Sequence, residues 1–191
     1  MNYQDSKEKL AAYQGEIREL RKAIREVQLS REAEAVDNYT FTATEGSVSL
    51  TQLFGDKDTL FIVHNMGKDC SYCTLWADGF NGVADHLQSR AAFVVSSPDS
   101  PDVQREFAAS RNWRFRMVSH QDTTFADDMG YKSEGSEGGF WPGVSVFKKD
   151  GDGVRRVSDT SFGPGDDFCG VWHLLDLIPE GADGWQPKYS Y

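Results

Sequence analysis

The sequence has 191 residues, of which 26% are charged and 13% are aromatic, a composition typical of a globular protein that can bury a full hydrophobic core. The formal net charge of −10 argues against nucleic acid or an anionic membrane surface as a partner. No apolar run approaches the ~18 residues of a membrane-spanning helix, and the N-terminal segment lacks the apolar core of a signal peptide.

Residues 4 to 35 have the pattern of an amphipathic helix. Apolar residues recur at alternating spacings of three and four, which is an a/d heptad seam: Leu10, Tyr13, Ile17, Leu20, Ile24 and Val27. A helix with so short a seam is marginal in water, so these side chains need a surface to cover them, either the chain's own domain or a second subunit. Because the domain has its own helices for the faces of its sheet, we favour a homodimer through this helix. The chain then divides into an N-terminal helix, residues 1–36, and a domain, residues 37–191.

The next elements alternate between strand and helix. Residues 39–41 are a short strand candidate, and residues 48–50 continue into a short helical turn that ends at Gly55. Residues 59–64 are an unbroken apolar run, typical of a strand covered on both faces. A helix follows, on which four apolar residues form one stripe: Trp76, Phe80, Val83 and Leu87. Residues 91–96 form a second buried-type strand.

The second half of the chain continues this alternation. Ser100 and Pro101 open a helix as N-cap and first helical residue, and residues 115–118 form a third strand, so crossover units feed a parallel sheet. Residues 132–139 form a loop by composition. Residues 144–147 and 154–157 are joined by Asp-Gly turn residues and predict an antiparallel hairpin. A last amphipathic helix over residues 171–178 is closed by Pro179.

Cys70 and Cys73 lie where the strand of residues 59–64 turns into a helix. Free N–H groups and the positive end of the helix dipole meet at a helix start, and both stabilise a thiolate. Three cysteines are too few for a disulfide scaffold, so we expect a cytoplasmic protein that uses these two for chemistry. Lys68 should lower the pKa of Cys70 and Asp69 should raise it; the sequence does not say which is nearer.

Two other interpretations of the cysteines carry less weight. Both could be small core residues, although their place at a strand-to-helix junction favours reactivity. A structural zinc site needs four ligands, whereas one CxxC supplies two and no histidine pair has matching spacing among His64, His86, His120 and His173. We therefore expect no metal and no other cofactor. Cys169 is interpreted as a packed core thiol, with a resolving role as the minor alternative.

Several motifs together resemble a known family. They are Tyr39-Thr-Phe, Gly46-Ser-Val-Ser-Leu-Thr-Gln-Leu-Phe54, Cys70-Ser-Tyr-Cys-Thr-Leu-Trp-Ala-Asp-Gly-Phe-Asn-Gly82 and His173-Leu-Leu-Asp-Leu177. The chain is similar in these to a bacterial family of predicted dithiol-disulfide oxidoreductases, catalogued mainly as a domain of unknown function. Residues 96–131 resemble the peroxiredoxin branch of the thioredoxin fold. The resemblance implies a thioredoxin-like three-layer α/β/α domain with a mixed central sheet.

The resemblance also implies roles for particular residues. Cys70 would attack a disulfide as nucleophile and Cys73 would resolve the mixed disulfide. Pro142 would be the cis-proline that thioredoxin-like proteins hold opposite the dithiol, leaving the backbone of Trp141 free to pair with substrate. Trp76 and Asp78 would border the dithiol, although Trp76 is equally well a core residue on the helix stripe.

Three functions remain open. The leading one is a dithiol-disulfide oxidoreductase that acts on a disulfide-bearing protein or small molecule. The second is a peroxidase of peroxiredoxin type, but that branch's Pro-x-x-x-Thr-x-x-Cys approach is absent: Val63 and Gly67 stand seven and three residues before Cys70. The third is a redox-inert binding module, which the fold alone does not exclude.

Overall fold

A computed structural model describes residues 1–133 and 139–191. It separates into two compact units, Met1–Ala33 and Glu34–Tyr191. Of the loop predicted at residues 132–139, residues 134–138 lie outside the described part of the chain. None of the helices in the described part is both long and apolar enough to cross a bilayer.

The first unit is one long helix, α1 (Tyr3–Ser30), capped by the side chain of Asn2, which accepts a hydrogen bond from the Asp5 N–H at 2.9 Å. All six residues of the predicted seam are exposed, by 45% to 69% of their surface. The helix ends earlier than the predicted residue 35. It does so because Glu34, Ala35 and Val36 form a strand, β1 (Glu34–Val36), that pairs with the domain.

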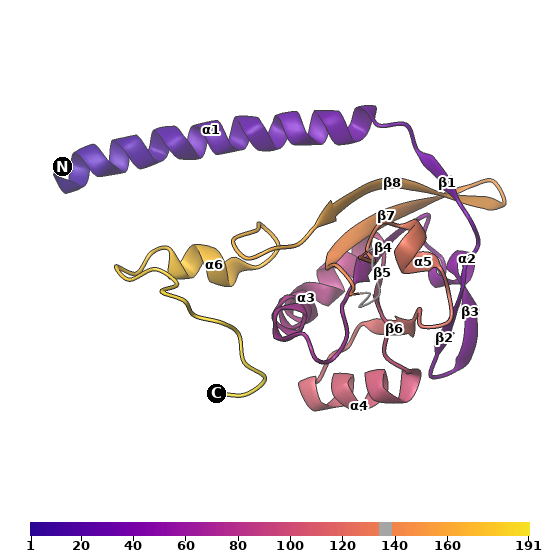
Figure 1. Ribbon diagram of the computed structural model, residues 1–191. Coiled ribbons are helices and arrows are strands. Elements are labelled where there is room, and N and C mark those ends of the chain that lie inside the picture. The colour runs from indigo at the N-terminus through magenta and orange to yellow at the C-terminus, as the bar shows by residue number, and fades with distance from the viewer. Residues whose placement is uncertain (134–138) are drawn as a thin grey trace. The chain divides into compact units, whose positions relative to one another are not determined.

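The second unit is built on one mixed sheet with the order β1-β8-β7-β4-β5-β6-β2-β3 (Figure 1). β4 lies at its centre, parallel to β5 and antiparallel to β7, and β5 is parallel to β6. The hairpin of β7 and β8 was predicted from its Asp-Gly turn. The remaining strand bounds are β2 (Thr40–Ala43), β3 (Gly46–Ser49), β4 (Thr59–His64), β5 (Ala92–Ser97), β6 (Arg116–Ser119), β7 (Gly143–Asp150) and β8 (Gly153–Ser161).

Alternating side chains of β4 divide the core into two layers. Leu60 and Ile62 join the hydrophobic cluster on one face, which contains residues of α2 (Leu50–Leu53) and α5 (Phe125–Asp128). Phe61 and Val63 join the cluster on the other face. That cluster includes residues of α3 (Ser71–Arg90), α4 (Pro101–Arg111) and α6 (Gly170–Leu175). The predicted three-layer α/β/α arrangement with a mixed sheet is confirmed.

Further elements besides α1 differ from the sequence prediction. β1 and α5 were not predicted, because three and four residues are too few to establish a periodicity. The last helix stops at Leu175 instead of Ile178, because the chain tightens into turns there: the N–H of Leu177 bonds to the carbonyl of Leu174 at 3.2 Å, and that of Ile178 to Leu175 at 3.1 Å.

Candidate redox site

The loop between β4 and α3 places the first cysteine through hydrogen bonds that its backbone N–H groups donate. The N–H of Gly67 donates to Asn65 Oδ1 at 2.8 Å, and the N–H of Cys70 donates to the carbonyl of Gly67 at 3.2 Å. The N–H of Lys68 donates to Asp99 Oδ2 at 2.8 Å. Gly67 has a φ of +103°, and a Cβ there would lie 3.1 Å from the Asp99 carboxylate, so only glycine fits this turn without strain.

Cys70 is the N-cap residue of α3. Its Sγ accepts a hydrogen bond from the N–H of Cys73 at 3.0 Å, which is the position that serine or aspartate oxygen takes in ordinary caps. The hydrogen bond from the Cys73 thiol, followed by the N–H groups of Cys73 and Tyr72, lowers the pKa of Cys70 to about 7, against the opposing effect of partial burial. A substantial fraction of Cys70 is therefore thiolate at neutral pH.

Cys73 is the buried partner, with only 2% of its surface exposed. The thiol of Cys73 donates a hydrogen bond to Cys70, and burial disfavours the charged thiolate form of Cys73. Both effects raise the pKa of Cys73. The N–H of Met66 approaches its Sγ at 3.5 Å. The pair is therefore asymmetric, with a nucleophilic thiolate at the half-buried position and a protonated thiol behind it.

Lys68 and Asp69, which were expected to shift the pKa of Cys70 in opposite directions, form an ion pair with each other. Lys68 Nζ lies 2.7 Å from Asp69 Oδ1. Opposite charges so close largely cancel at a distance, so the hydrogen bonds at the helix start set the thiolate's stability.

Trp76 and Asp78 serve the packing of α3. Trp76 is 3% exposed in the hydrophobic cluster beneath this helix, and its indole N–H donates to Asp166 Oδ1 at 3.3 Å. Asp78 pairs with Arg111 of α4 and accepts a hydrogen bond from the indole N–H of Trp113 at 2.8 Å. Asp78 thus ties α3 to α4, and its predicted place at the border of the dithiol stays a prediction.

The expectation of a cis-proline at position 142 is wrong: the Trp141–Pro142 peptide bond is trans. The trans form is the lower-energy isomer of an X–Pro bond, and here the chain runs on directly into β7. The N–H of Trp141 donates to the carbonyl of Tyr131 at 2.9 Å, and the carbonyl of Pro142 accepts from the Phe162 N–H at 2.9 Å. The Trp141 side chain is 57% exposed.

The C-terminal segment contributes a residue that the sequence did not reveal. Burial, followed by the negative charges of Cys70 and Asp69, raises the pKa of Tyr189, so its phenol lies within electrostatic reach of the dithiol. Arg111 holds this segment by donating to the carbonyl of Tyr189 at 2.7 Å. The tail had no periodicity or motif by which this could have been predicted.

Two buried histidines, His64 and His120, lie within electrostatic reach of each other, although no spacing in the sequence linked them. His64 Nε2 is hydrogen-bonded to Ser145 Oγ at 2.9 Å, and His120 Nδ1 to Ser96 Oγ at 2.7 Å. His64 belongs to the face of β4 opposite the one that α3 covers.

Within the described residues no group of three or more candidate ligands is arranged to hold a metal ion. Cys169 is 5% exposed in the core, where burial raises its pKa.

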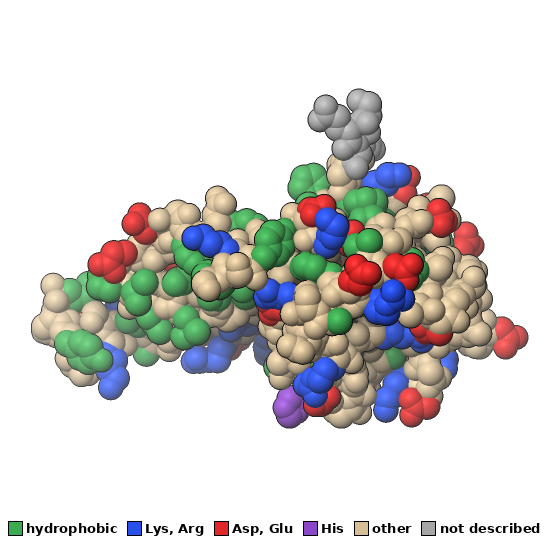
Figure 2. Space-filling view, turned by 90° about the horizontal axis from the view of Figure 1, so that it is seen from below, with side chains coloured by type: hydrophobic (Ala, Val, Ile, Leu, Met, Phe, Trp, Pro, Cys, Tyr) green, Lys and Arg blue, Asp and Glu red, His purple; other side chains and the backbone are tan. Residues whose placement is uncertain are grey.

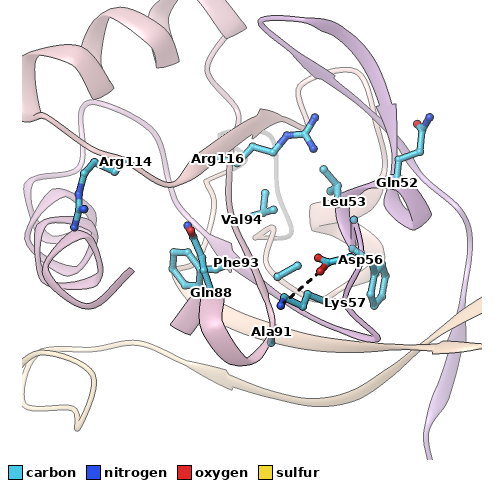
Figure 3. Close-up of a pocket in the computed structure, with 13 residues that line it drawn as sticks. Gln52, Leu53, Asp56, Lys57, Gln88, Ala91, Phe93, Val94, Arg114 and Arg116 are labelled. Carbon is cyan, nitrogen blue, oxygen red and sulfur yellow. Dashed lines mark ion pairs between the residues drawn. The ribbon is translucent and has the colours of Figure 1, made fainter. Parts of the chain in front are cut away.

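A cavity of about 440 Å³ lies away from the dithiol (Figure 3). It is lined at the far end of α3 by Gln88 and at the start of β5 by Phe93 and Val94, whereas the cysteines stand at the opposite end of the helix. Its Lys57 and Asp56 form an ion pair at 3.8 Å. None of the predicted site residues lines this cavity.

Comparison with known proteins places the chain in a family and a fold. A family model described as "Bacterial protein of unknown function (DUF899)" matches residues 2–190, and a search of curated proteins finds no match. One similar solved structure is a variant of peroxiredoxin Q from Xanthomonas campestris, which is 17% identical, with a TM-score of 0.54 over 64% of this chain and 80% of that one. Another is a variant of PrxQ from Xylella fastidiosa, which is 14% identical, with a TM-score of 0.59 over 74% of this chain and 89% of that one. The peroxidoxin BcpB of Mycobacterium tuberculosis is 21% identical, with a TM-score of 0.56 over 68% of this chain and 84% of that one. The thioredoxin-like fold is thereby confirmed.

Proposed function

The chain belongs to the bacterial family of unknown function DUF899, and we propose that it is a thiol-disulfide oxidoreductase acting through Cys70 and Cys73. The observation that carries the proposal is the hydrogen bonding at the start of α3. Cys70 Sγ accepts the N–H of Cys73 at 3.0 Å, and its pKa is lowered to about 7, whereas the pKa of Cys73 is raised. Disulfide exchange requires a nucleophilic thiolate and, about one helical turn away, a second thiol that resolves the mixed disulfide.

The reaction has two steps. The Cys70 thiolate attacks one sulfur of a substrate disulfide, which breaks the S–S bond, forms a mixed disulfide and releases the other sulfur as a thiol after it takes up a proton. Cys73 then loses its proton and attacks Cys70 Sγ. The second substrate thiol leaves, the substrate has gained two electrons, and Cys70 and Cys73 are joined. A dithiol reductant must return the two electrons.

Thiol peroxidase activity is the second candidate, favoured by the peroxiredoxins among the similar structures. In that reaction the Cys70 thiolate would attack one oxygen of the peroxide and break the O–O bond, which gives a sulfenic acid and releases the other oxygen, after it takes up a proton, as water or an alcohol. Cys73 would then condense with the sulfenic acid to a disulfide and water. The proline and threonine that the peroxiredoxin branch places seven and three residues before its cysteine are Val63 and Gly67 here. We therefore rank disulfide exchange first.

A comparison of the rates at which two oxidants react with the protein tests this ranking. The reduced protein is mixed in stopped flow with a small disulfide or with hydrogen peroxide at micromolar concentration, and the change in tryptophan fluorescence is followed. We expect fast reaction with the disulfide, and with peroxide a rate close to that of free cysteine. Cys70→Ser should abolish the first reaction, and Cys169→Ser, the matched control, should leave it intact. Rapid stoichiometric oxidation by peroxide would reverse the ranking.

A further inference from the structure

An aromatic recess begins at the residue between the two cysteines. It has a volume of about 200 Å³, and Tyr72 of the CxxC lines it together with residues from the segment after β8, among them Trp172, Asp176 and Trp185. The recess therefore lies beside the start of α3, where Cys70 is half-buried. Small-molecule sites usually span ~300–1,000 Å³, so this recess suits one long side chain of a larger substrate.

Three aromatic rings form the wall of this recess. The rings of Tyr72 and Trp172 stack with centroids 6.1 Å apart, and those of Trp172 and Trp185 meet edge to face at 5.8 Å. The face of an aromatic ring carries negative charge, and tryptophan binds cations best of the three aromatic side chains. Trp172 itself is buried between its neighbours, so a cation reaches the half-exposed rings of Tyr72 and Trp185, which suit an ammonium or guanidinium group.

An acidic side chain completes the recess. Within the described part of the chain, the carboxylate of Asp176 makes no hydrogen bond or ion pair, and the residue is exposed. Asp166 differs, because its carboxylate accepts from the N–H groups of Gly163 and Phe168 at 3.0 and 2.9 Å. Asp176 therefore keeps its capacity to pair with a cation, and the net charge of −10 would attract a basic substrate at longer range.

We propose that this recess is the substrate-recognition site of the dithiol and that it takes a lysine or arginine side chain flanking the disulfide of a protein substrate. The proposal rests on disulfide exchange at Cys70. The cationic side chain lies against Tyr72 and Trp185 with its charge toward Asp176, and this holds the neighbouring disulfide near the Cys70 thiolate. Holding a reactant in place raises the rate of its reaction without changing the chemistry.

The test uses three synthetic peptides, identical except for lysine, norleucine or glutamate beside one cysteine, each carrying a chromophoric thiol in mixed disulfide. The rate of release of the chromophore by the reduced full-length protein is divided by the rate with dithiothreitol, which corrects for the peptide's own reactivity. We expect the lysine peptide to react about thirtyfold faster than the norleucine peptide, the size of one desolvated cation–π contact. Asp176→Asn and Trp185→Ala should each remove most of this preference. Glu180→Gln, which removes a charge from the same segment but outside the recess, should leave it unchanged.

A binding measurement separates this inference from the reaction on which it rests. In the double variant Cys70→Ser, Cys73→Ser, the reduced lysine peptide should quench tryptophan fluorescence at lower concentration than the norleucine peptide. Equal rates and equal binding for the two peptides would overturn the recess as a cation site and leave the exchange reaction standing. Preference for norleucine would also overturn it. Absence of exchange with every peptide, alongside selective binding of the lysine peptide, would refute the proposed function and support the recess.

Discussion

The hydrogen bonds around Cys70 set the pH at which the site becomes reactive. Below pH ~7 the sulfur is a thiol and unreactive; above it the thiolate predominates. The rate of alkylation of Cys70 by iodoacetamide should therefore rise through a midpoint of about 7, lower than the ~8.5 of a free cysteine. Peptide mapping by mass spectrometry follows the residue, and the buried Cys169 is an internal reference.

A substitution checks the cause of this shift. Cys73→Ala removes the thiol that donates to Cys70, which is the largest contribution to its lowered pKa. The midpoint should then move upward, toward the value of a free cysteine. A midpoint that stays near 7 in the variant would assign the shift to the backbone N–H groups of α3 instead.

The buried histidines make stability depend on pH. Burial lowers the pKa of His120 to about 4, and burial, followed by the charges of His120 and Arg156, holds the pKa of His64 well below its usual range. The unfolded chain takes up protons at ~6.5 while the folded chain does not, so stability should fall as the pH drops from about 6.5 to 4. His120→Gln should flatten this fall by up to ~1.4 kcal/mol per pH unit, measured by urea unfolding. His86→Gln on the surface of α3 is the control, and an equal slope in wild type and His120→Gln would contradict the account.

At the level of elements, α1 exposes a continuous apolar seam to solvent. We propose that its seam pairs with a second copy of the helix. In a parallel pairing Glu16, at position g, lies beside Arg21 of the second copy, at position e, whereas an antiparallel pairing sets e positions against e positions, which carry Lys7 and Arg21 and no acid. Charge therefore favours a parallel homodimer.

Removal of α1 tests this pairing. The deletion should end at Ala33, because β1 starts at Glu34 and pairs with β8. It should halve the native mass in light scattering, and Leu20→Glu in the full chain should do the same, because it puts a charge in the seam. Lys22→Glu, on the outer face, should leave the mass unchanged. A full-length protein that is monomeric at high micromolar concentration would exclude the dimer.

At the level of the whole molecule, local features were predictable and long-range ones were not. The bounds of β4 and the place of Cys70 at the start of α3 follow from neighbouring residues, so the sequence predicted both. The pairing of β1 with β8 joins residues more than a hundred positions apart, as does that of Arg156 with Glu34 at 2.6 Å. The meeting of Tyr72 with Trp172 is of the same kind and was missed.

The amino-acid composition also does not predict where the charges lie on the surface. The net charge of −10 gives no location, whereas on the face in Figure 2 acidic and basic side chains lie interspersed across the right-hand part of the view. Several cations in the described part of the chain are paired with acids, Arg114 with Asp85 at 3.0 Å among them. Specific recognition of a basic group therefore depends on individual carboxylates such as Asp176, because screening by salt weakens a diffuse field.

The central claim is that Cys70 and Cys73 form a reversible disulfide, and counting thiols across a graded dithiothreitol series tests it most directly. The denatured protein should show one thiol, that of Cys169, when oxidised and three when reduced. The change should follow a single two-electron couple between about −270 and −120 mV, the range of comparable dithiols, and Cys70→Ser should abolish it. A thiol count that stays constant across the series would contradict the account.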